Sequence, residues 1–175
     1  MYDEIWAMTQ LLEDTKIPNW CANSLTVSHS DPAMLDRFMT SSAAGNLFGE
    51  FVPLQESGEW DYELAVRKWG TKWEASDSDF QRDGNTVSGV FDTAWAPPIE
   101  FYQALVVLGF EVEADYHEPG MSFAGVFTTN EGEFFYDYNF SEPNWRNGIK
   151  HEVILEMLEY EYQSYLEYNE DGGQD

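Results

Sequence analysis

Apolar residues recur along this chain at helical spacing in some segments and at every second position in others. Residues 3–14 carry apolar side chains near a period of 3.6 with acids in the first turn, which predicts a short amphipathic helix. Residues 20–29 alternate in side-chain character as a half-buried strand does. A helix should follow, capped by Ser30, with Pro32 in its first turn and an end before Gly45.

The middle of the chain mixes apolar residues with turn formers. It is predicted to be extended over residues 46–58 and to form a short helix at 59–68. Strands are expected at 71–76 and 85–95. Residues 77–84, between these strands, are polar and rich in turn formers, so we interpret them as a linker.

The second half is expected to hold a helix, three strands and a long final helix. Prolines suit the first helical turn and glycine suits a helix end, so the first of these helices should begin at Pro97–Pro98 and stop at Gly109. The sequence Thr-Asn-Glu-Gly at 129–132 is typical of a hairpin turn. The remaining predicted elements are strands at 110–117, 121–129 and 133–140 and a helix from 144 to about 169.

The main order of strand, helix, strand, strand, helix and strand matches the split βαβ arrangement of ferredoxin-like folds. We therefore predict the α+β class, with an antiparallel sheet, helices on one face, an added β-hairpin and a long C-terminal helix. A single domain should span residues 1–170, with its core at about 17–117 and the hairpin and final helix at 121–169. Residues 171–175 are expected to form a frayed acidic tail.

Charge dominates the composition. The 175 residues include 33 Asp and Glu against 8 Lys and Arg, a formal net charge of −25 at pH 7. Disordered acidic chains are poor in aromatic residues, whereas 17% of this chain is aromatic and 43% is hydrophobic, so it can fill a core. Because carboxylates repel phosphates, direct binding to DNA, RNA or an anionic membrane is not expected.

Location follows from the same composition. No stretch approaches the ~18 apolar residues of a membrane span, and the acidic N-terminus lacks the basic region of a signal peptide. The single cysteine, Cys21, cannot form an internal disulfide, which fits a reducing cytoplasm. We expect a cytoplasmic protein that does not contact membranes.

Three islands of sequence contain tryptophan in a fixed order: PNWCAN at Pro18–Asn23, WGTKW at Trp69–Trp73 and FDTAWAPP at Phe91–Pro98. As a set they resemble a family of poorly characterised proteins from bacteriophages and conjugative plasmids, described as having a ferredoxin-like domain of unknown function. The resemblance covers Ile17 to His117. It implies a ferredoxin-like fold and brings no reaction with it.

The large residues of these islands are interpreted as packing where three strands start or end. An aromatic binding surface is the alternative. Asp92 is expected to pair with Lys72 across neighbouring strands. The structural residues proposed on this basis are Trp20, Trp69, Trp73, Asp92 and Trp95.

Signatures of catalysis are absent or poor. The three histidines, His29, His117 and His151, lie in separate predicted elements without metal-binding spacing, and we interpret them as surface residues. Asp77 begins a sequence that resembles a calcium loop, but its sixth residue is Arg82, where glycine is needed. We therefore expect no enzyme activity, no metal and no cofactor.

The predicted C-terminal helix carries acids spaced so that they share one face. Neighbouring like charges destabilise a helix by a few tenths of a kcal/mol, so this row opposes the helix that bears it. Duplex DNA has one phosphate per ~3.4 Å of axis on each strand, and one row would need acids of the hairpin nearby to approach that density. The candidate partner-binding residues are Glu152, Glu156, Glu159, Glu167 and Glu170 on the helix, with Glu131, Glu133 and Asp137 on the hairpin.

Two functions of different class remain. The first is a non-catalytic nucleic-acid mimic of phage or plasmid origin, which binds a basic nucleic-acid-binding surface of a host defence protein or nuclease complex and blocks it, as an anti-CRISPR or other counter-defence inhibitor would. The second is a structural or assembly protein whose acidic surface serves mainly solubility.

Overall fold

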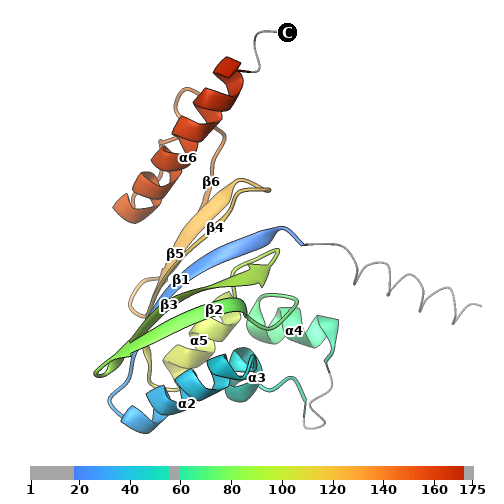
Figure 1. The fold of residues 1–175 in the computed structure, drawn as a ribbon, viewed down its shortest axis with the longest axis vertical. Helices are drawn as coiled ribbons and strands as arrows, with labels where there is room; N and C mark the ends of the chain where they lie inside the picture. The colour runs from blue at the N-terminus through green and yellow to red at the C-terminus, as the bar shows by residue number, and fades with distance from the viewer. Residues whose placement is uncertain (1–17, 56–59, 172–175) are drawn as a thin grey trace, which may run out of the picture.

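The computed structural model of the chain describes residues 18–55 and 60–171 (Figure 1). The helix predicted at 3–14 and most of the predicted tail lie outside the described residues.

Six antiparallel strands form one sheet in the order β2-β3-β1-β4-β5-β6. The first four strands along the chain have the split βαβ order, because β3 lies between β1 and β2, and β4 lies on the other side of β1. The α+β class and the ferredoxin-like arrangement are confirmed. The strands are β1 (Trp20–Ser28), β2 (Ser76–Asp83), β3 (Thr86–Ala94), β4 (Glu111–Glu118), β5 (Phe123–Thr128) and β6 (Gly132–Asp137).

Four helices lie on one side of this sheet, and the C-terminal helix lies apart from them, near the β6 edge (Figure 1). The four are α2 (Pro32–Ala43), α3 (Leu47–Phe51), α4 (Tyr62–Trp69) and α5 (Ile99–Val107). The last helix, α6 (Glu152–Asp171), packs on the opposite face, over β5 and β6.

The main core lies between the sheet and the four helices, and aromatic rings fill much of it. Phe48 of α3 contacts Phe101 of α5 at 4.5 Å between ring centroids, and Phe91 of β3 at 6.0 Å. Each such fully buried ring contributes roughly 1.5–3 kcal/mol relative to exposure. A second, smaller core lies on the other face, where Val126 of β5 packs with Ile154 and other apolar residues of α6.

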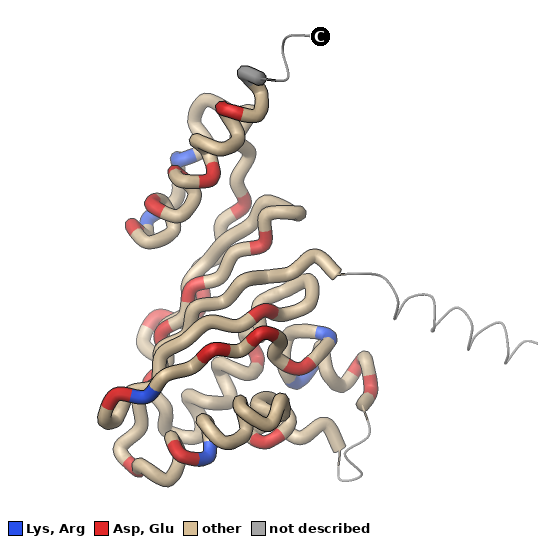
Figure 2. The backbone as a smooth tube through the Cα atoms, viewed as in Figure 1, with Lys and Arg blue, Asp and Glu red and all other residues tan. Residues whose placement is uncertain are grey.

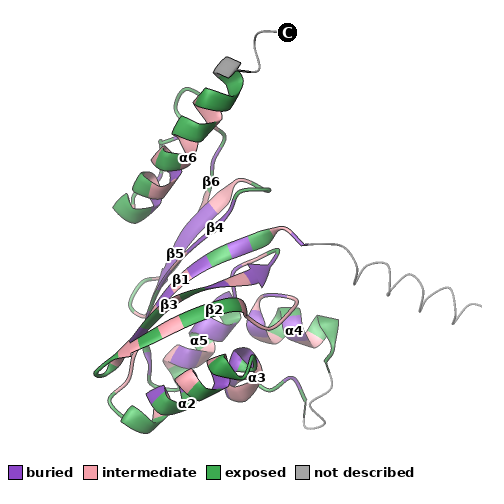
Figure 3. Cartoon of the chain, in the orientation of Figure 1, coloured by how far each residue is buried: buried purple, intermediate pink, exposed green. Residues whose placement is uncertain are grey.

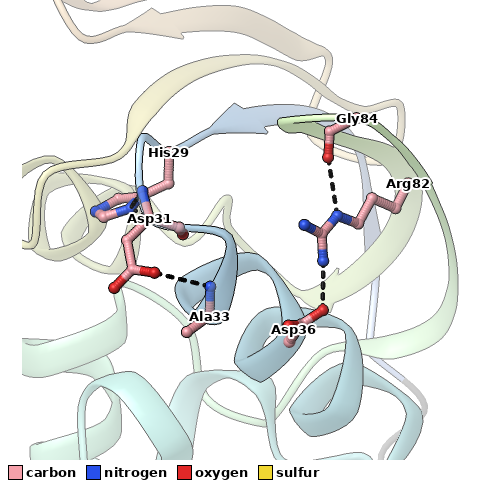
Figure 4. Close-up of polar contacts among 6 residues, drawn as sticks. All are labelled: His29, Asp31, Ala33, Asp36, Arg82 and Gly84. Atoms are coloured by element: carbon pink, nitrogen blue, oxygen red, sulfur yellow. Dashed lines mark hydrogen bonds and ion pairs between the residues drawn. The ribbon is translucent and has the colours of Figure 1, made fainter.

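The prediction for residues 71–84 is wrong, because β2 occupies most of the segment interpreted as a linker. As an edge strand, β2 buries little, and Phe80 alone packs against the main core. Gly84, with φ of +59°, forms the turn to β3. Arg82 donates to the carbonyl of Gly84 at 2.9 Å and pairs with Asp36 of α2 (Figure 4). These contacts fix the hairpin to the helix layer.

Residues 46–58 were also predicted incorrectly, since residues 47–51 form the short helix α3. Its first amide groups are satisfied from a distant part of the chain. The half-buried carboxylate of Glu74 accepts hydrogen bonds from Phe48 N at 2.6 Å and Gly49 N at 3.0 Å. Burial raises the pKa of Glu74.

Other helix ends move by one to several residues. Asp31, not Ser30, caps α2 by accepting from Ala33 N at 2.9 Å (Figure 4). Asp61 caps α4, which begins later than predicted. Turns fill residues 141–148, so α6 starts at Glu152 rather than 144; Gly148 has a φ of +90°, which a helix cannot adopt.

A buried polar network joins β1, β3 and α5. The side-chain amide of Asn23 donates to the hydroxyl of Thr93 at 2.9 Å and to the carbonyl of Cys21 at 2.8 Å. The Tyr102 hydroxyl of α5 donates to the Asn23 side-chain oxygen at 3.1 Å. All of these residues are buried, so the network stabilises the sheet only while its partners are complete.

Tyr102→Phe should lower the free energy of unfolding by about 1–3 kcal/mol, because it leaves the buried oxygen of Asn23 without its donor. Urea denaturation measures the change. Tyr168→Phe, which removes the same hydroxyl from a side chain 79% exposed, should change it by less than about 0.5 kcal/mol. Equal effects of the two substitutions would contradict the role given to Tyr102.

Candidate partner-binding surface

The three tryptophan islands meet at one end of β1 and β3. Trp20 stands opposite Ala94 in the sheet, and the backbone N–H of Trp95 donates to the Asn19 carbonyl at 2.9 Å. The hydroxyl of Thr71, in the second island, donates to the Ala94 carbonyl at 2.8 Å. Segments far apart in sequence are thus joined by hydrogen bonds, as residues with a structural role would be.

The tryptophans themselves differ in environment. Trp69 is buried, contacts the ring of Phe48 and donates its ring N–H to the Val52 carbonyl at 2.7 Å. Trp20 and Trp95 remain 39% and 42% exposed. Trp20 lies 6.3 Å from the ring of Trp73, which is half-buried. The tryptophans of the islands therefore combine one buried core ring with rings that are partly open to solvent.

The predicted cross-strand position of Lys72 opposite Asp92 is wrong. Lys72 precedes β2, and its ammonium lies over the rings of Trp73 at 4.8 Å and Tyr62 at 5.6 Å. In the sheet, Asp92 stands opposite Ser76 of β2 and Ala22 of β1.

Acids line the sheet face that the four helices leave uncovered. On β4, Val112 and Ala114 point into the main core, so the alternate residues Glu111, Glu113 and Asp115 point the other way. The register and alternation of the strands place acids of β2 and β3 on this same face. Between the acids of β2 and those of β4, the strands β3 and β1 present mostly small and hydroxyl side chains. The acids of this surface, here called the acidic sheet face, are Asp79, Asp83, Asp92, Glu111, Glu113 and Asp115.

Basic residues are almost absent from these strands. Arg82 is the single Lys or Arg in the six strands, and its pairing with Asp36 turns it toward the helix side. Arg37 likewise pairs with Glu50 at 2.6 Å within the helix layer. Figure 2 shows acids along the strands and few basic residues, which lie mainly toward the helices and beside α6.

Strand geometry sets the spacing of these acids: Glu111, Glu113 and Asp115 occupy alternate positions of β4, whereas on β2 Gln81 stands between Asp79 and Asp83. Alternate residues of a strand lie about 6.8 Å apart, and three steps of about 4.8 Å between strands separate β2 from β4. Two acidic rows about 14 Å apart therefore flank the central strands. This arrangement is two-dimensional, unlike the single row predicted from the sequence.

A shallow cavity of about 330 Å³ lies on this face, with Asp77, Asp92, Asp115 and His117 in its lining. Burial raises the pKa of Asp92, with a further contribution from the charge of Asp77, and burial also raises the pKa of Asp115. Among the residues that the structure describes, no group of three or more His, Cys, Asp or Glu is placed to hold a metal ion.

The acidic row of α6 lies beside this face, since Asp115 stands opposite Val126, which packs under α6. Glu152, Glu156 and Glu167 are exposed as the row requires. Glu159 is instead half-buried and pairs with Arg146 at 2.6 Å, which neutralises part of the row. Glu170 belongs to α6, but its side chain is outside the described part.

The hairpin acids do not join this row. Glu133 and Asp137 stand opposite Phe127 and Phe123, both of which pack with the main core. They therefore lie on the face of the sheet opposite α6, where Glu133 accepts a hydrogen bond from the Tyr116 hydroxyl at 2.6 Å. Glu131 lies in the turn between β5 and β6.

Two histidines fasten α6 to the sheet, which the sequence interpretation missed. His117 is 7% exposed, so its assignment as a surface residue is wrong. Its Nε2 lies 2.8 Å from the Tyr138 hydroxyl, and its Nδ1 lies 3.3 Å from the carboxylate of Glu161 in α6. His151 contacts the Tyr136 hydroxyl at 2.5 Å. The alternation along β4, which gives His117 the same face as Asp115, was the available signal.

Residues 68–156 match the family described as "Ferredoxin-like domain in Api92-like protein". The chain belongs to this family. The match includes the second and third islands but not the first, and it extends beyond His117 through the hairpin into α6, so it is shifted from the range over which the islands suggested a resemblance. No curated protein and no solved structure matches the chain.

In the described ranges, no helix is long and apolar enough to cross a membrane.

The raised carboxyl pKa values predict an unusual dependence of stability on pH. Burial raises the pKa of Glu74, Asp92, Asp115 and Glu161 above the ordinary values of 4.5 for Glu and 3.8 for Asp. Such groups bind more protons when folded, so stability falls as pH rises above those values and through the folded pKa. Burial lowers the pKa of His117 below its ordinary value of 6.5. This group therefore binds fewer protons when folded, and its contribution to stability rises with pH near 6.5.

Replacing one of these carboxyl groups removes its share of the pH dependence. In Glu161→Gln the free energy of unfolding, measured by urea denaturation, should fall less or rise more between about pH 4.5 and pH 6.5 than in the parent protein. Glu156→Gln, at an exposed position of the same helix, should leave the pH dependence nearly unchanged. Equal pH dependence of Glu161→Gln and the parent protein would refute this expectation.

Proposed function

We propose that this protein is a non-catalytic, acidic binding protein that occupies the basic nucleic-acid-binding surface of another protein and so blocks nucleic acid from it. The observation that carries the proposal is the acidic sheet face, which has acids on β2, β3 and β4 and no Lys or Arg pointing out of it. A basic groove would meet complementary charge over several strands rather than along one row.

Electrostatics favours a basic protein over other partners. Phosphates and anionic headgroups carry the same sign of charge as this face and are repelled by it. A groove rich in Lys and Arg is attracted over about 8–10 Å at physiological salt, which speeds association. The target class that fits is a nuclease or defence protein of a host bacterium, whose function depends on such a groove.

The position of α6 adds to this surface. The exposed acids Glu152 and Glu156 extend the charge from the sheet onto the helix, and the contacts of His117 with Tyr138 and Glu161 hold the helix in place. The binding surface proposed here therefore comprises the acidic sheet face and the exposed acids of α6. The hairpin acids Glu133 and Asp137, on the other face, are outside it.

Neutralising the acidic sheet face should weaken binding to the captured partner. The protein is immobilised and used to capture binding proteins from a bacterial lysate. Excess duplex DNA is then added, and the captured proteins that it displaces are identified and purified. The triple variant Asp79→Asn, Glu111→Gln and Glu113→Gln changes only exposed side chains. We expect its affinity for the purified partner to fall at least tenfold, about 1.4 kcal/mol. The partner's DNA binding should be inhibited in proportion.

The matched control removes three charges elsewhere. Glu63, Glu100 and Asp137 are exposed and lie away from the acidic sheet face, on α4, on α5 and on the opposite face of β6. Their replacement by Gln or Asn should change the affinity by less than about threefold. If both triple variants lose affinity equally, or if neither does, the charge acts only through solubility and the proposal fails. A partner that keeps its DNA while bound would also contradict it.

A further inference from the structure

A groove of about 710 Å³ lies between α6 and the segments that flank β5 and β6. Aromatic rings form much of its wall: the ring of Phe140 lies 4.7 Å from that of Tyr138 and 5.7 Å from that of Tyr165. Tyr160, 78% exposed, stands at its side, and Glu161 supplies the single carboxylate of the lining. Ser122, Asn139, Ser141 and Ser164 are the other polar residues of the lining apart from the tyrosines.

Glu161 is placed to accept further hydrogen bonds. Its carboxylate oxygens lie 3.5 Å from the Tyr138 hydroxyl and 3.3 Å from His117 Nδ1, and its side chain is 32% exposed. Burial raises the pKa of Glu161 and lowers that of His117, so neutral histidine gives the carboxylate no compensating charge at neutral pH. No Lys or Arg lines the groove.

A neighbouring part of α6 shows how the same chemistry holds a guanidinium group. Arg146 donates to both oxygens of Glu159 at 2.7–2.8 Å. Its guanidinium carbon lies 4.3 Å from the centre of the Trp145 ring and 5.0 Å from that of Tyr162. A carboxylate of α6 and two aromatic rings therefore bind an arginine of this chain itself.

We propose that the groove binds an arginine side chain of the basic partner, with the guanidinium against the aromatic rings and donating to Glu161. The groove repeats the combination that holds Arg146, a carboxylate of α6 beside aromatic rings, within a volume large enough for a side chain and its flanking backbone. The identity of the chain that supplies the arginine rests on the proposed function. The chemistry of the groove does not.

Arginine fits this groove better than the alternatives. Its planar guanidinium stacks on ring faces, is weakly hydrated and can donate two parallel hydrogen bonds to one carboxylate, whereas the lysine ammonium is strongly hydrated. An anionic ligand would be repelled by Glu161. A neutral aromatic ligand would bring the carboxylate of Glu161 no charged donor.

Blocked tripeptides provide the probe. Acetyl-Gly-Arg-Gly-amide and its citrulline counterpart have nearly the same shape, but citrulline is neutral. Titration of each into the full-length protein is followed by NMR. The arginine peptide should give saturable shifts in signals of Tyr138, Tyr160, Tyr165 and Glu161, with an affinity at least about fivefold above that of the citrulline peptide. Equal affinity of the two peptides, or shifts spread over all acidic surfaces, would overturn the inference.

Matched variants locate the binding. Glu161→Gln should weaken the arginine peptide at least about fivefold, whereas Glu156→Gln, an exposed position on the same helix, should change it less than about twofold. Tyr160→Leu should also weaken it, while Tyr168→Leu, 79% exposed and outside the lining, should not. Since Tyr160 is itself 78% exposed, its loss tests the groove without endangering the fold.

The outcomes separate this inference from the proposed function. If the arginine peptide fails to bind while the acidic sheet face variant still loses its captured partner, the groove is not an arginine site and the function stands. If the peptide binds through Glu161 while that variant keeps its partner as well as the control variant does, the groove stands and the proposed function fails.

Discussion

Repulsion among carboxylates is the constraint on which the arrangement of this protein depends. A net charge of −25 opposes any compact state, because folding brings like charges closer together. Two aromatic-rich cores on opposite faces of the sheet offset this repulsion. Ion pairs also offset the repulsion. Arg37 pairs with Glu50 in the helix layer, and Arg82 of β2 pairs with Asp36 of α2. Many of the remaining acids lie on the open part of the sheet and on α6.

The function that we propose follows from which faces of the sheet are covered. Four helices cover one side of the sheet, α6 covers only the β5–β6 part of the other, and the strands from β2 to β4 remain open there. Acids at alternate strand positions then share one surface, which a helix row alone cannot provide. We propose that the acidic sheet face and the aromatic groove beside α6 contact one partner together, with charge guiding association and an arginine fixing its position.

Local signals predicted much of the fold. The alternation beginning at Cys21 identifies β1 and its buried side, and the prolines before Ile99 mark the start of α5. Distant contacts explain the failures. Glu74 binds the first amides of α3 from 25 residues away, and β2 places only Phe80 against the core. Neither α3 nor β2 therefore shows a periodic pattern of apolar residues. For the candidate site, the composition predicted an acidic surface but not which acids share it. Only the strand register shows that the hairpin residue Glu133 and the acidic row of α6 lie on opposite faces of the sheet.

Zero-length crosslinking of carboxylates to lysines in the complex with the captured partner tests the central claim most directly, because it reports which acids touch basic side chains. We expect crosslinks at Asp79, Glu111 and Glu113 of the sheet and at Glu152 and Glu156 of α6. Crosslinks confined to Glu133 and Asp137, on the other face, and to Glu131 in the hairpin turn would contradict the proposed surface.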